Sequence, residues 1–352
     1  MISWVPKKNI DIDKVNMNII ECVESKHFTN NGKHVQSTQQ KIKQLFKIEE
    51  ENDILLTCNG AMGLNCLISG FNIKYNKRLR WVVQSFTFPC STQGNLIDSI
   101  IIDIDENMGP NMKELLEKIN EYDGIVVTNC FGTCTNINLY ENFCKKNNKL
   151  LIFDNAASPL TYYENKNHLN YGDGCMVSLH HTKPIGFGEG GFIVFKKKYL
   201  EFMEKAICFG YTTTNRYDYN MYANNYKMSE IACIYISDYI NNIEHINDIH
   251  IKMMSYFISE IKNNNLENKI KLFSNFTDYN KCLMATIPIL FNNDISTNIF
   301  IDNNVEAKKY YYPLNINNKN AKRLFDTIIC LPLNVDTTFE TIRLYIRILI
   351  SI

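Results

Sequence analysis

The sequence predicts an α/β protein in two unequal parts: a large domain over residues 1–245, built on a mainly parallel sheet, and a smaller α+β domain over residues 246–352. Strand-like and helix-like stretches alternate through the first two thirds, which is typical of a parallel sheet covered by helices on both sides. The 352 residues exceed the usual length of one domain. No Pro or Gly interrupts residues 228–254, which we expect to form one or two helices near the boundary.

Apolar runs of strand length, bounded by polar or turn-forming residues, predict the individual elements. Residues 112, 115, 116 and 119 are apolar, which is the spacing of one helical face, and residues 61–69 also have helical character. In the C-terminal part we expect short strands over 282–291 and a terminal helix from about Thr338. The strands expected in the large domain are 54–58, 81–84, 100–104, 124–128, 150–153, 175–179 and 191–195.

Composition and charge exclude several classes of protein. Hydrophobic residues make up 45% of the chain and charged residues 21%, which is typical of a globular protein and not of a disordered one. Lys plus Arg and Asp plus Glu both number 37, so no net charge favours nucleic acid or an anionic membrane. The apolar runs are shorter than the roughly 18 residues of a membrane span. Because the N-terminus also lacks an apolar signal region, we expect a cytoplasmic protein.

Metal sites and disulfides are not predicted. The chain has twelve cysteines and seven histidines, but neither residue type shows the spacing of metal ligands. Cys130 and Cys134 are the closest cysteines, and His180 and His181 are adjacent. Without an export signal, we expect the cysteines to be reduced and mostly buried.

The most informative segment is SLHHTKPIGFGEGG, residues 178–191, directly after a β-rich run. Its glycines satisfy the G-x-G-x-x-G pattern of dinucleotide sites, but the segment does not open the first βαβ unit and lacks the acidic residue further on. Another interpretation centres on Lys183, whose amine can form a Schiff base beside a bound planar ligand. Taken alone, Lys183 could equally be a solvated surface lysine.

Three other places at strand ends fit the same chemistry. Asp154 follows an apolar strand and could pair with a pyridinium nitrogen, although an Asp there is usually a helix cap or a turn residue. Gly60 and Ala61 open a helix after a strand and offer backbone N–H groups to a phosphate, or simply form a βα turn. Phe88 could stack on an aromatic cofactor, although core packing is the commoner fate of Phe.

Together these residues resemble the DegT/DnrJ/StrS family of sugar aminotransferases, pyridoxal-phosphate enzymes of the aspartate aminotransferase fold (fold type I). The family's motifs occur in the same order over nearly the whole chain. Any one motif alone would be weak evidence, but the complete set in order is specific. It implies pyridoxal 5'-phosphate as the cofactor. The matching segments are 29–35, 59–64, 86–88, 154–157, the lysine block through Gly191, 225–230, 310–314 and 331–333.

The resemblance also implies a role for each matching residue. Lys183 would bind the cofactor covalently, and Asp154 would contact the pyridine nitrogen. Asn225 would reach the phosphate in the neighbouring subunit, which implies a homodimer with shared active sites. The other implied roles are stacking on the ring by Phe88, phosphate binding by the backbone of Gly60 and Ala61 and the hydroxyl of Ser178, and contact with the nucleotide sugar by the segment containing Lys308, Tyr311 and Tyr312.

The sequence departs from the family pattern at three of these positions. Ala61 replaces the usual Thr, which removes one hydroxyl donor to phosphate, a loss of about 1 kcal/mol. Ala157 stands where most members place Gln or His against the cofactor's 3-hydroxyl group, so that contact would come from water or from Asn155. Lys227 replaces a frequent Arg and keeps its charge but not its fork geometry.

The implied reaction is a two-stage transamination. Glutamate gives its amino group to the cofactor, leaving pyridoxamine phosphate, and a nucleotide-linked keto sugar then accepts the amine. The block after Lys183 is most similar to members that aminate carbon 4 of a dTDP-4-keto-6-deoxyhexose, giving a viosamine-type sugar. The alternatives are amination at carbon 3 of a dTDP-3-keto-6-deoxyhexose and a non-catalytic, cofactor-binding regulatory protein. A sister branch of sugar dehydratases has His in place of the lysine.

Overall fold

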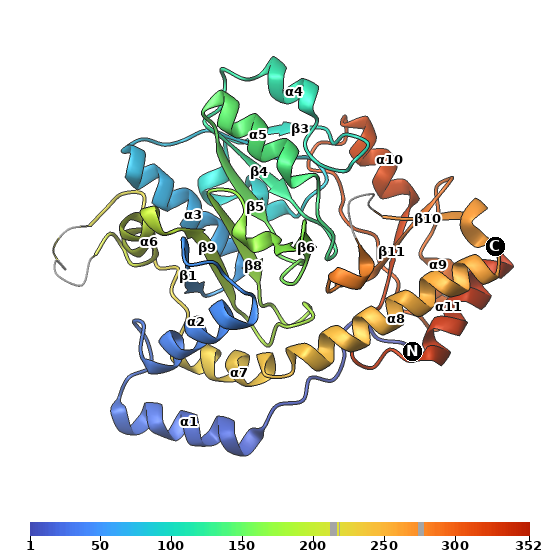
Figure 1. Ribbon diagram of the computed structural model, residues 1–352, viewed down its shortest axis with the longest axis horizontal. Coiled ribbons are helices and arrows are strands. Elements are labelled where there is room, and N and C mark those ends of the chain that lie inside the picture. Colours follow the sequence, from blue (N-terminus) through green and yellow to red (C-terminus); the bar gives the residue numbers. More distant parts are fainter. Residues whose placement is uncertain (212–216, 218, 274–277) are drawn as a thin grey trace.

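A seven-stranded sheet forms the centre of the large domain in the computed structural model, which describes residues 1–211, 217, 219–273 and 278–352 (Figure 1). The strand order is β1-β9-β8-β5-β4-β2-β3, and β9 runs opposite to the other six strands, which are parallel to one another. The mainly parallel α/β architecture predicted from the sequence is confirmed. The strands are β1 (Asn52–Thr57), β2 (Trp81–Gln84), β3 (Ile100–Ile102), β4 (Gly124–Thr128), β5 (Leu150–Asp154), β8 (Gly174–Ser178) and β9 (Gly191–Lys196).

Alternating side chains of the sheet strands enter two different cores. On β4, Val126 packs into the core shared with α3 (Gly60–Tyr75) and α6 (Leu200–Ile207). Its neighbours Ile125 and Val127 face the other core, because successive side chains of a strand point to opposite sides. That second face is covered by α2 (Lys33–Leu45), α4 (Met112–Glu117), α5 (Ile137–Asn147) and α7 (Glu230–Ile240), and α1 (Ile12–Ser25) packs on α7.

The smaller C-terminal part has its own core on a three-stranded antiparallel sheet, β10-β11-β12. Helix α8 (Ile243–Asn263) runs from the large domain along this part (Figure 1), so the boundary predicted at residue 245 lies in its first turn. The other elements here are β10 (Ile270–Leu272), β11 (Ile287–Phe291), α9 (Asn298–Ile301), α10 (Lys319–Thr327), β12 (Ile328–Leu331) and α11 (Phe339–Ser351).

Several short elements complete the chain. A two-stranded hairpin, β6 (Tyr162–Tyr163) and β7 (Lys166–Asn167), lies outside the main sheet. Single turns of 3-10 helix are η1 (Pro89–Thr92), η2 (Gly94–Leu96), η3 (His168–Asn170), η4 (Lys197–Tyr199), η5 (Leu266–Asn268) and η6 (Tyr279–Lys281).

The strand expected over 282–291 begins only at Ile287. The preceding residues bond to the large domain instead: the N–H of Leu283 donates to the carbonyl of Leu160 (2.8 Å), and that of Ala285 to the carbonyl of Phe131 (2.7 Å). These bonds use the backbone groups that a longer strand would need. They also hold the two parts of the chain together next to the carboxyl ends of β4 and β5.

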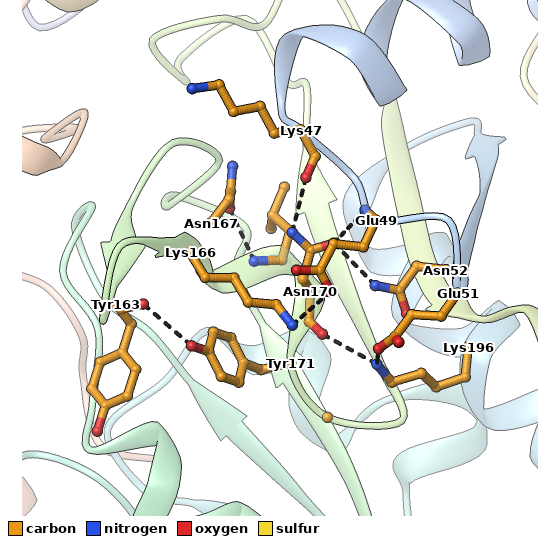
Figure 2. A network of polar contacts seen from close by, with 12 residues as sticks. Lys47, Glu49, Glu51, Asn52, Tyr163, Lys166, Asn167, Asn170, Tyr171 and Lys196 are labelled. Atoms are coloured by element: carbon orange, nitrogen blue, oxygen red, sulfur yellow. Dashed lines mark hydrogen bonds and ion pairs between the residues drawn. The ribbon is translucent and has the colours of Figure 1, made fainter.

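A polar network anchors the connection between α2 and β1 at the opposite end of the sheet (Figure 2). The side-chain oxygen of Asn170 accepts the N–H of Glu49 (2.9 Å) and the amide of Asn52 (3.0 Å), and its nitrogen donates to the carbonyl of Lys47 (3.0 Å). The Lys196 ammonium at the end of β9 pairs with Glu51 at 2.8 Å. The network fixes β1 beside β9, and therefore the start of α3 that follows β1.

Candidate active site

A cavity of about 510 Å³ lies at the carboxyl ends of the parallel strands, where open α/β sheets place their ligands. Its walls come from the large domain, from residues 285–286 and 310–311 of the C-terminal part, and from Trp4 near the N-terminus. The structure brings most of the site residues predicted from the sequence to this one cavity: Gly60, Ala61, Phe88, Asp154, Ser178, Lys183 and Tyr311.

Lys183 lies in a tight turn between β8 and β9. Its N–H donates to the carbonyl of His180 (2.8 Å), and its own carbonyl accepts the N–H of Gly186 (3.1 Å). A Cβ atom on Gly186 would come within 2.0 Å of the His180 oxygen, so only glycine fits there. Burial lowers the pKa of the Lys183 amine, and the charge of Asp154 opposes that change. A lysine amine in such surroundings is favoured as a neutral nucleophile.

Asp154 is the last residue of β5, and only 1% of its surface is exposed. Burial raises the pKa of this carboxyl to about 6, although the N–H of Ala156, which donates to it at 3.0 Å, and the charge of Lys183 both act to lower it. A buried carboxylate without a fixed cation as partner is costly. The ionised form of Asp154 is therefore stabilised by a positively charged group in the cavity, and a protonated pyridine nitrogen is such a group.

The start of α3 forms an anion-binding end of the cavity. Asn59 caps the helix by accepting the N–H of Met62 (2.9 Å), and the N–H groups of Gly60 and Ala61 lie in the first turn, where helices have no internal acceptor for them. A Cβ atom on Gly60 would lie 2.8 Å from that of Ser178. Glycine therefore allows the helix start to approach Ser178, whose hydroxyl lines the same cavity.

These features fit pyridoxal phosphate in three separate respects. The amine of Lys183 suits the aldehyde group, the carboxyl of Asp154 suits the ring nitrogen, and the start of α3 with Ser178 suits the phosphate. Phe88 lines the cavity with 54% of its surface exposed, and its ring is available to stack on the planar ring of the cofactor.

Three predicted site residues lie outside this cavity. Asn225 is exposed, and its side chain accepts the Lys227 ammonium at 2.6 Å. Lys308 pairs with a carboxylate of Glu306 at 3.1 Å and lies over the ring of Trp4, 4.8 Å from its centroid. Tyr312 packs edge-on against Phe325 at 5.2 Å and is 59% exposed. Of the segment predicted to contact substrate, the residues that line the cavity are Tyr311, as predicted, and its neighbour Tyr310.

The cavity also contains residues that the sequence analysis did not select. Trp4 and Phe131 contribute aromatic walls, and Thr128 and Asn129 lie beside Asp154. Asn129 directly follows β4, just as Asp154 ends β5, so the same strand-end signal could have found it. Trp4 has no such signal, because only the folded chain brings it to the site. The predicted substitute for the missing Gln or His, Asn155, is fully buried and does not line the cavity, whereas Ala157 does.

No helix of the described ranges is long and apolar enough to cross a membrane. In the same residues, no group of three or more His, Cys, Asp or Glu side chains is arranged to hold a metal ion.

The fold and the cavity together define the class of protein, a pyridoxal-phosphate-dependent aminotransferase. The model of the DegT/DnrJ/EryC1/StrS aminotransferase family matches residues 9–349, and the chain belongs to this family of sugar aminotransferases. The predictions of the family, the enzyme class and the cofactor are confirmed.

The chain is similar to one curated relative in sequence and to two solved structures in fold. The chain is 26% identical over 261 residues, 69% of its length and 68% of the relative's, to the UDP-4-amino-4,6-dideoxy-N-acetyl-beta-L-altrosamine transaminase of Campylobacter jejuni. Its fold is similar to Helicobacter pylori PseC, an aminotransferase involved in the biosynthesis of pseudoaminic acid, with a TM-score of 0.81, 16% identity and coverage of 99% and 98% of the two chains. Its fold is also similar to a DegT DnrJ EryC1 StrS aminotransferase from Brucella abortus, with a TM-score of 0.81, 16% identity and coverage of 96% of this chain and 95% of that one.

Proposed function

We propose that the enzyme transfers the amino group of glutamate to carbon 4 of a nucleotide-linked 4-keto-6-deoxyhexose, giving a 4-amino-4,6-dideoxyhexose. The observation that carries the transamination is the meeting of the Lys183 amine and the buried Asp154 carboxyl in one cavity with the start of α3. The choice of carbon 4 is supported by the lysine block and by the Campylobacter relative, whose name contains a 4-amino-4,6-dideoxy sugar.

The order of the strands orients the cofactor in this proposal. Asp154 is flanked by Thr128 of β4 on one side and by Met176 of β8 on the other. Ser178, two residues beyond Met176, lies on the β8 side with the start of α3, which would hold the phosphate. The phosphate and the 3-hydroxyl group are on opposite flanks of the line from ring nitrogen to aldehyde carbon. The 3-hydroxyl group would therefore face the β4 side.

Asn129 is the polar residue on that flank. Its N–H donates to the carbonyl of Asp154 (2.9 Å), its side-chain nitrogen donates to Asn155 (2.8 Å), and its side-chain oxygen accepts from Thr135 (2.8 Å). An amide nitrogen carries two hydrogens, so one donor remains beyond the bond to Asn155. We infer that Asn129 supplies the contact that Gln or His makes where Ala157 stands.

In the proposed reaction, each group of site residues has a separate role. The bound cofactor supplies an electron-accepting ring that stabilises negative charge on the carbon losing a proton. Asp154 holds a proton on the ring nitrogen, and its burial makes that interaction strong. Lys183, as a free amine, moves the proton to and from the reacting carbon. Phe131, Tyr310 and Tyr311 exclude water from one wall of the cavity.

The nucleotide is the least determined part of the acceptor. The lysine block favours dTDP, whereas the name of the Campylobacter relative contains UDP, so a UDP-linked 4-keto-6-deoxyhexose is the second candidate. Amination at carbon 3 is retained as the competing regiochemistry.

We also propose a homodimer in which Asn225 reaches the phosphate of the neighbouring site. The same segment of the chain exposes large apolar side chains, including Phe209, Tyr219 and Met221, and exposed apolar clusters mark association surfaces. Mixed dimers at limiting pyridoxal phosphate test the shared site: Lys183→Ala protomers, inactive alone, should raise the activity of Asn225→Ala protomers, which bind the cofactor weakly alone, when the two are combined. Recovery fails if each site is complete within one chain.

The visible absorbance of the enzyme loaded with pyridoxal phosphate tests the first half of the reaction. Glutamate should convert the band of the bound cofactor to that of pyridoxamine phosphate, and 2-oxoglutarate should reverse the change. The Lys183→Ala variant should retain cofactor without a covalent link and should show no conversion, whereas Lys197→Ala, an exposed lysine outside the cavity, should behave as the unmodified enzyme. Full conversion by Lys183→Ala would refute the role of the lysine.

The acceptor is identified in the second half. The pyridoxamine-phosphate enzyme is mixed with dTDP-linked and UDP-linked 4-keto-6-deoxyhexoses and with a dTDP-3-keto-6-deoxyhexose, and the product is located by NMR. Return of the original band with a 4-amino product supports the proposal, and a 3-amino product overturns the regiochemistry.

A further inference from the structure

An N-terminal strap, residues 2–8, crosses from the C-terminal part to the turn that carries Lys183. Its first residues are fixed by backbone bonds: the N–H of Ile2 donates to the carbonyl of Asn304 (2.7 Å), and the carbonyl of Ile2 accepts the N–H of Glu306 (3.0 Å). The N–H of Trp4 donates to the carboxylate of Glu306 at 2.7 Å. The strap is therefore anchored well before it reaches Lys8.

Lys8 ends the strap on the backbone of the lysine turn. Its ammonium donates to the carbonyl of Lys183 at 2.6 Å and also to the carbonyl of Gly186. It lies over the ring of Tyr239, 4.7 Å from the centroid. Within the described part of the chain no carboxylate lies within salt-bridge distance of Lys8, so carbonyl oxygens and a ring face provide its surroundings.

The strap also packs directly against the turn. Trp4 and Pro6 line a cavity of only about 10 Å³ together with Thr182, Lys183 and His250. Trp4 lines the active-site cavity as well. The strap thus packs against the turn that carries Lys183 and also forms part of the wall of the active-site cavity.

We propose that Lys8 is a positioning residue for transamination: its ammonium fixes the backbone from which the Lys183 side chain reaches the reacting carbon. In the part of the chain that the structure describes, the carbonyl of Lys183 accepts two hydrogen bonds, one from the N–H of Gly186 within the turn (3.1 Å) and one from Lys8 (2.6 Å). The amine of Lys183 must change its position during the reaction while its backbone stays in place, and hydrogen bonds from a charged donor are the stronger kind. Burial lowers the pKa of Lys8 to about 7, so the donor is an ammonium below that pH and a neutral amine above it. This inference rests on the proposed role of Lys183.

Lys8→Met tests the inference, because Met keeps the length and the apolar stem but removes the charge and the donors. Lys7→Met is the matched control: the side chain of Lys7 is exposed, and its backbone N–H, which the substitution keeps, donates to the carboxylate of Asp336 (3.1 Å). Lys8→Arg restores a charged donor.

The rate of the glutamate half-reaction in single turnovers is the first measurement, and the visible circular dichroism of the bound cofactor is the second. We expect Lys8→Met to lower the half-reaction rate about tenfold or more and to change the dichroism, with Lys7→Met unchanged and Lys8→Arg recovering most of the rate. A lowered melting temperature with the rate and dichroism of the unmodified enzyme would overturn the proposal, because it would leave Lys8 a purely structural role.

Two further results keep the test decisive. If Lys8→Met does not fold, Lys8→Gln, which retains a neutral donor, must still show the slower half-reaction, and an unchanged rate overturns the proposal. Borohydride reduction followed by peptide mass spectrometry must find the cofactor on Lys183 in the unmodified enzyme. If the cofactor is not attached to Lys183, the proposed function itself is refuted. If it is attached there and Lys8→Met has the half-reaction rate of the unmodified enzyme, only the role of Lys8 is refuted.

Discussion

The ring of Tyr311 lies parallel to that of Phe131, with their centroids 5.4 Å apart and 4° between their planes. Tyr311 belongs to the C-terminal part and Phe131 to the loop after β4, and both line the active-site cavity. The stack therefore joins the two parts of the chain at the place where substrate would bind.

Removal of one ring from this stack should affect the acceptor more than the cofactor. For Tyr311→Ala we expect the KM for the keto sugar to rise about tenfold or more, because the wall is lost and the large domain loses its contact. Tyr311→Phe keeps the ring and should stay within about threefold of the unmodified enzyme. Steady-state kinetics on both substrates measures this, and equal effects of the two variants would assign the role to the hydroxyl group.

The cofactor-free enzyme should carry a stability cost at Asp154 that depends on pH. Burial raises the pKa of Asp154 from 3.8 to about 6 in the folded chain. Between these values the folded chain holds a proton that the unfolded chain has released, so the free energy of unfolding falls as pH rises through that window. Above pH 6 the whole cost is present, about 3 kcal/mol for a change of about two pKa units.

Asp154→Asn removes the charge but keeps the shape of the side chain. Thermal melts of the cofactor-free proteins should show the variant more stable than the unmodified enzyme at pH 8, and the difference should be small at pH 4. The same variant should lose transamination, because Asn cannot hold a proton on the ring nitrogen. A stability difference that is the same at both pH values would contradict the assigned cause.

Asn129→Ala should weaken cofactor binding if the side chain contacts the 3-hydroxyl group. One hydrogen bond of about 1 kcal/mol corresponds to roughly fivefold to tenfold in the dissociation constant. Fluorescence titration with pyridoxal phosphate gives this constant for folded protein, and adding Ala157→Gln to Asn129→Ala should recover part of the loss. Unchanged affinity in the single variant would leave the 3-hydroxyl group to water.

Glu230 should matter for stability although it does not line the active-site cavity. Its buried carboxylate accepts the backbone N–H groups of Gly32 (2.7 Å), His34 (2.8 Å) and Val35 (3.2 Å) at the start of α2. Glu230→Gln weakens these charge-assisted bonds, and we expect a loss of about 2 kcal/mol in the free energy of unfolding. Urea titration measures it, with the exposed Glu244→Gln expected within about 0.5 kcal/mol of the unmodified enzyme.

The sequence was most informative where a local pattern carries the information. Apolar runs ending in polar residues located Asp154 and the ends of β2 and β4, and the glycine-rich block located Lys183. The same patterns cannot show the direction of a strand, so the antiparallel course of β9 had no signal. Lys8 was also beyond reach, since its partner carbonyl on Lys183 lies 175 residues along the chain. The contacts of Lys308 with Trp4 and of Tyr312 with Phe325 likewise depend on tertiary packing, which a local pattern does not show.

The pairing of β1 with β9 has a consequence for synthesis on the ribosome. Thr57 at the end of β1 is partnered by Gly191 at the start of β9, and at about 5–20 residues per second translation needs on the order of ten seconds to reach that partner. During this interval β1, an edge strand of the sheet, has no partner strand, and the start of α3 has no Ser178 beside it until β8 has emerged. The nascent chain therefore completes its cofactor pocket only after the turn with Lys183 and strand β9 have emerged.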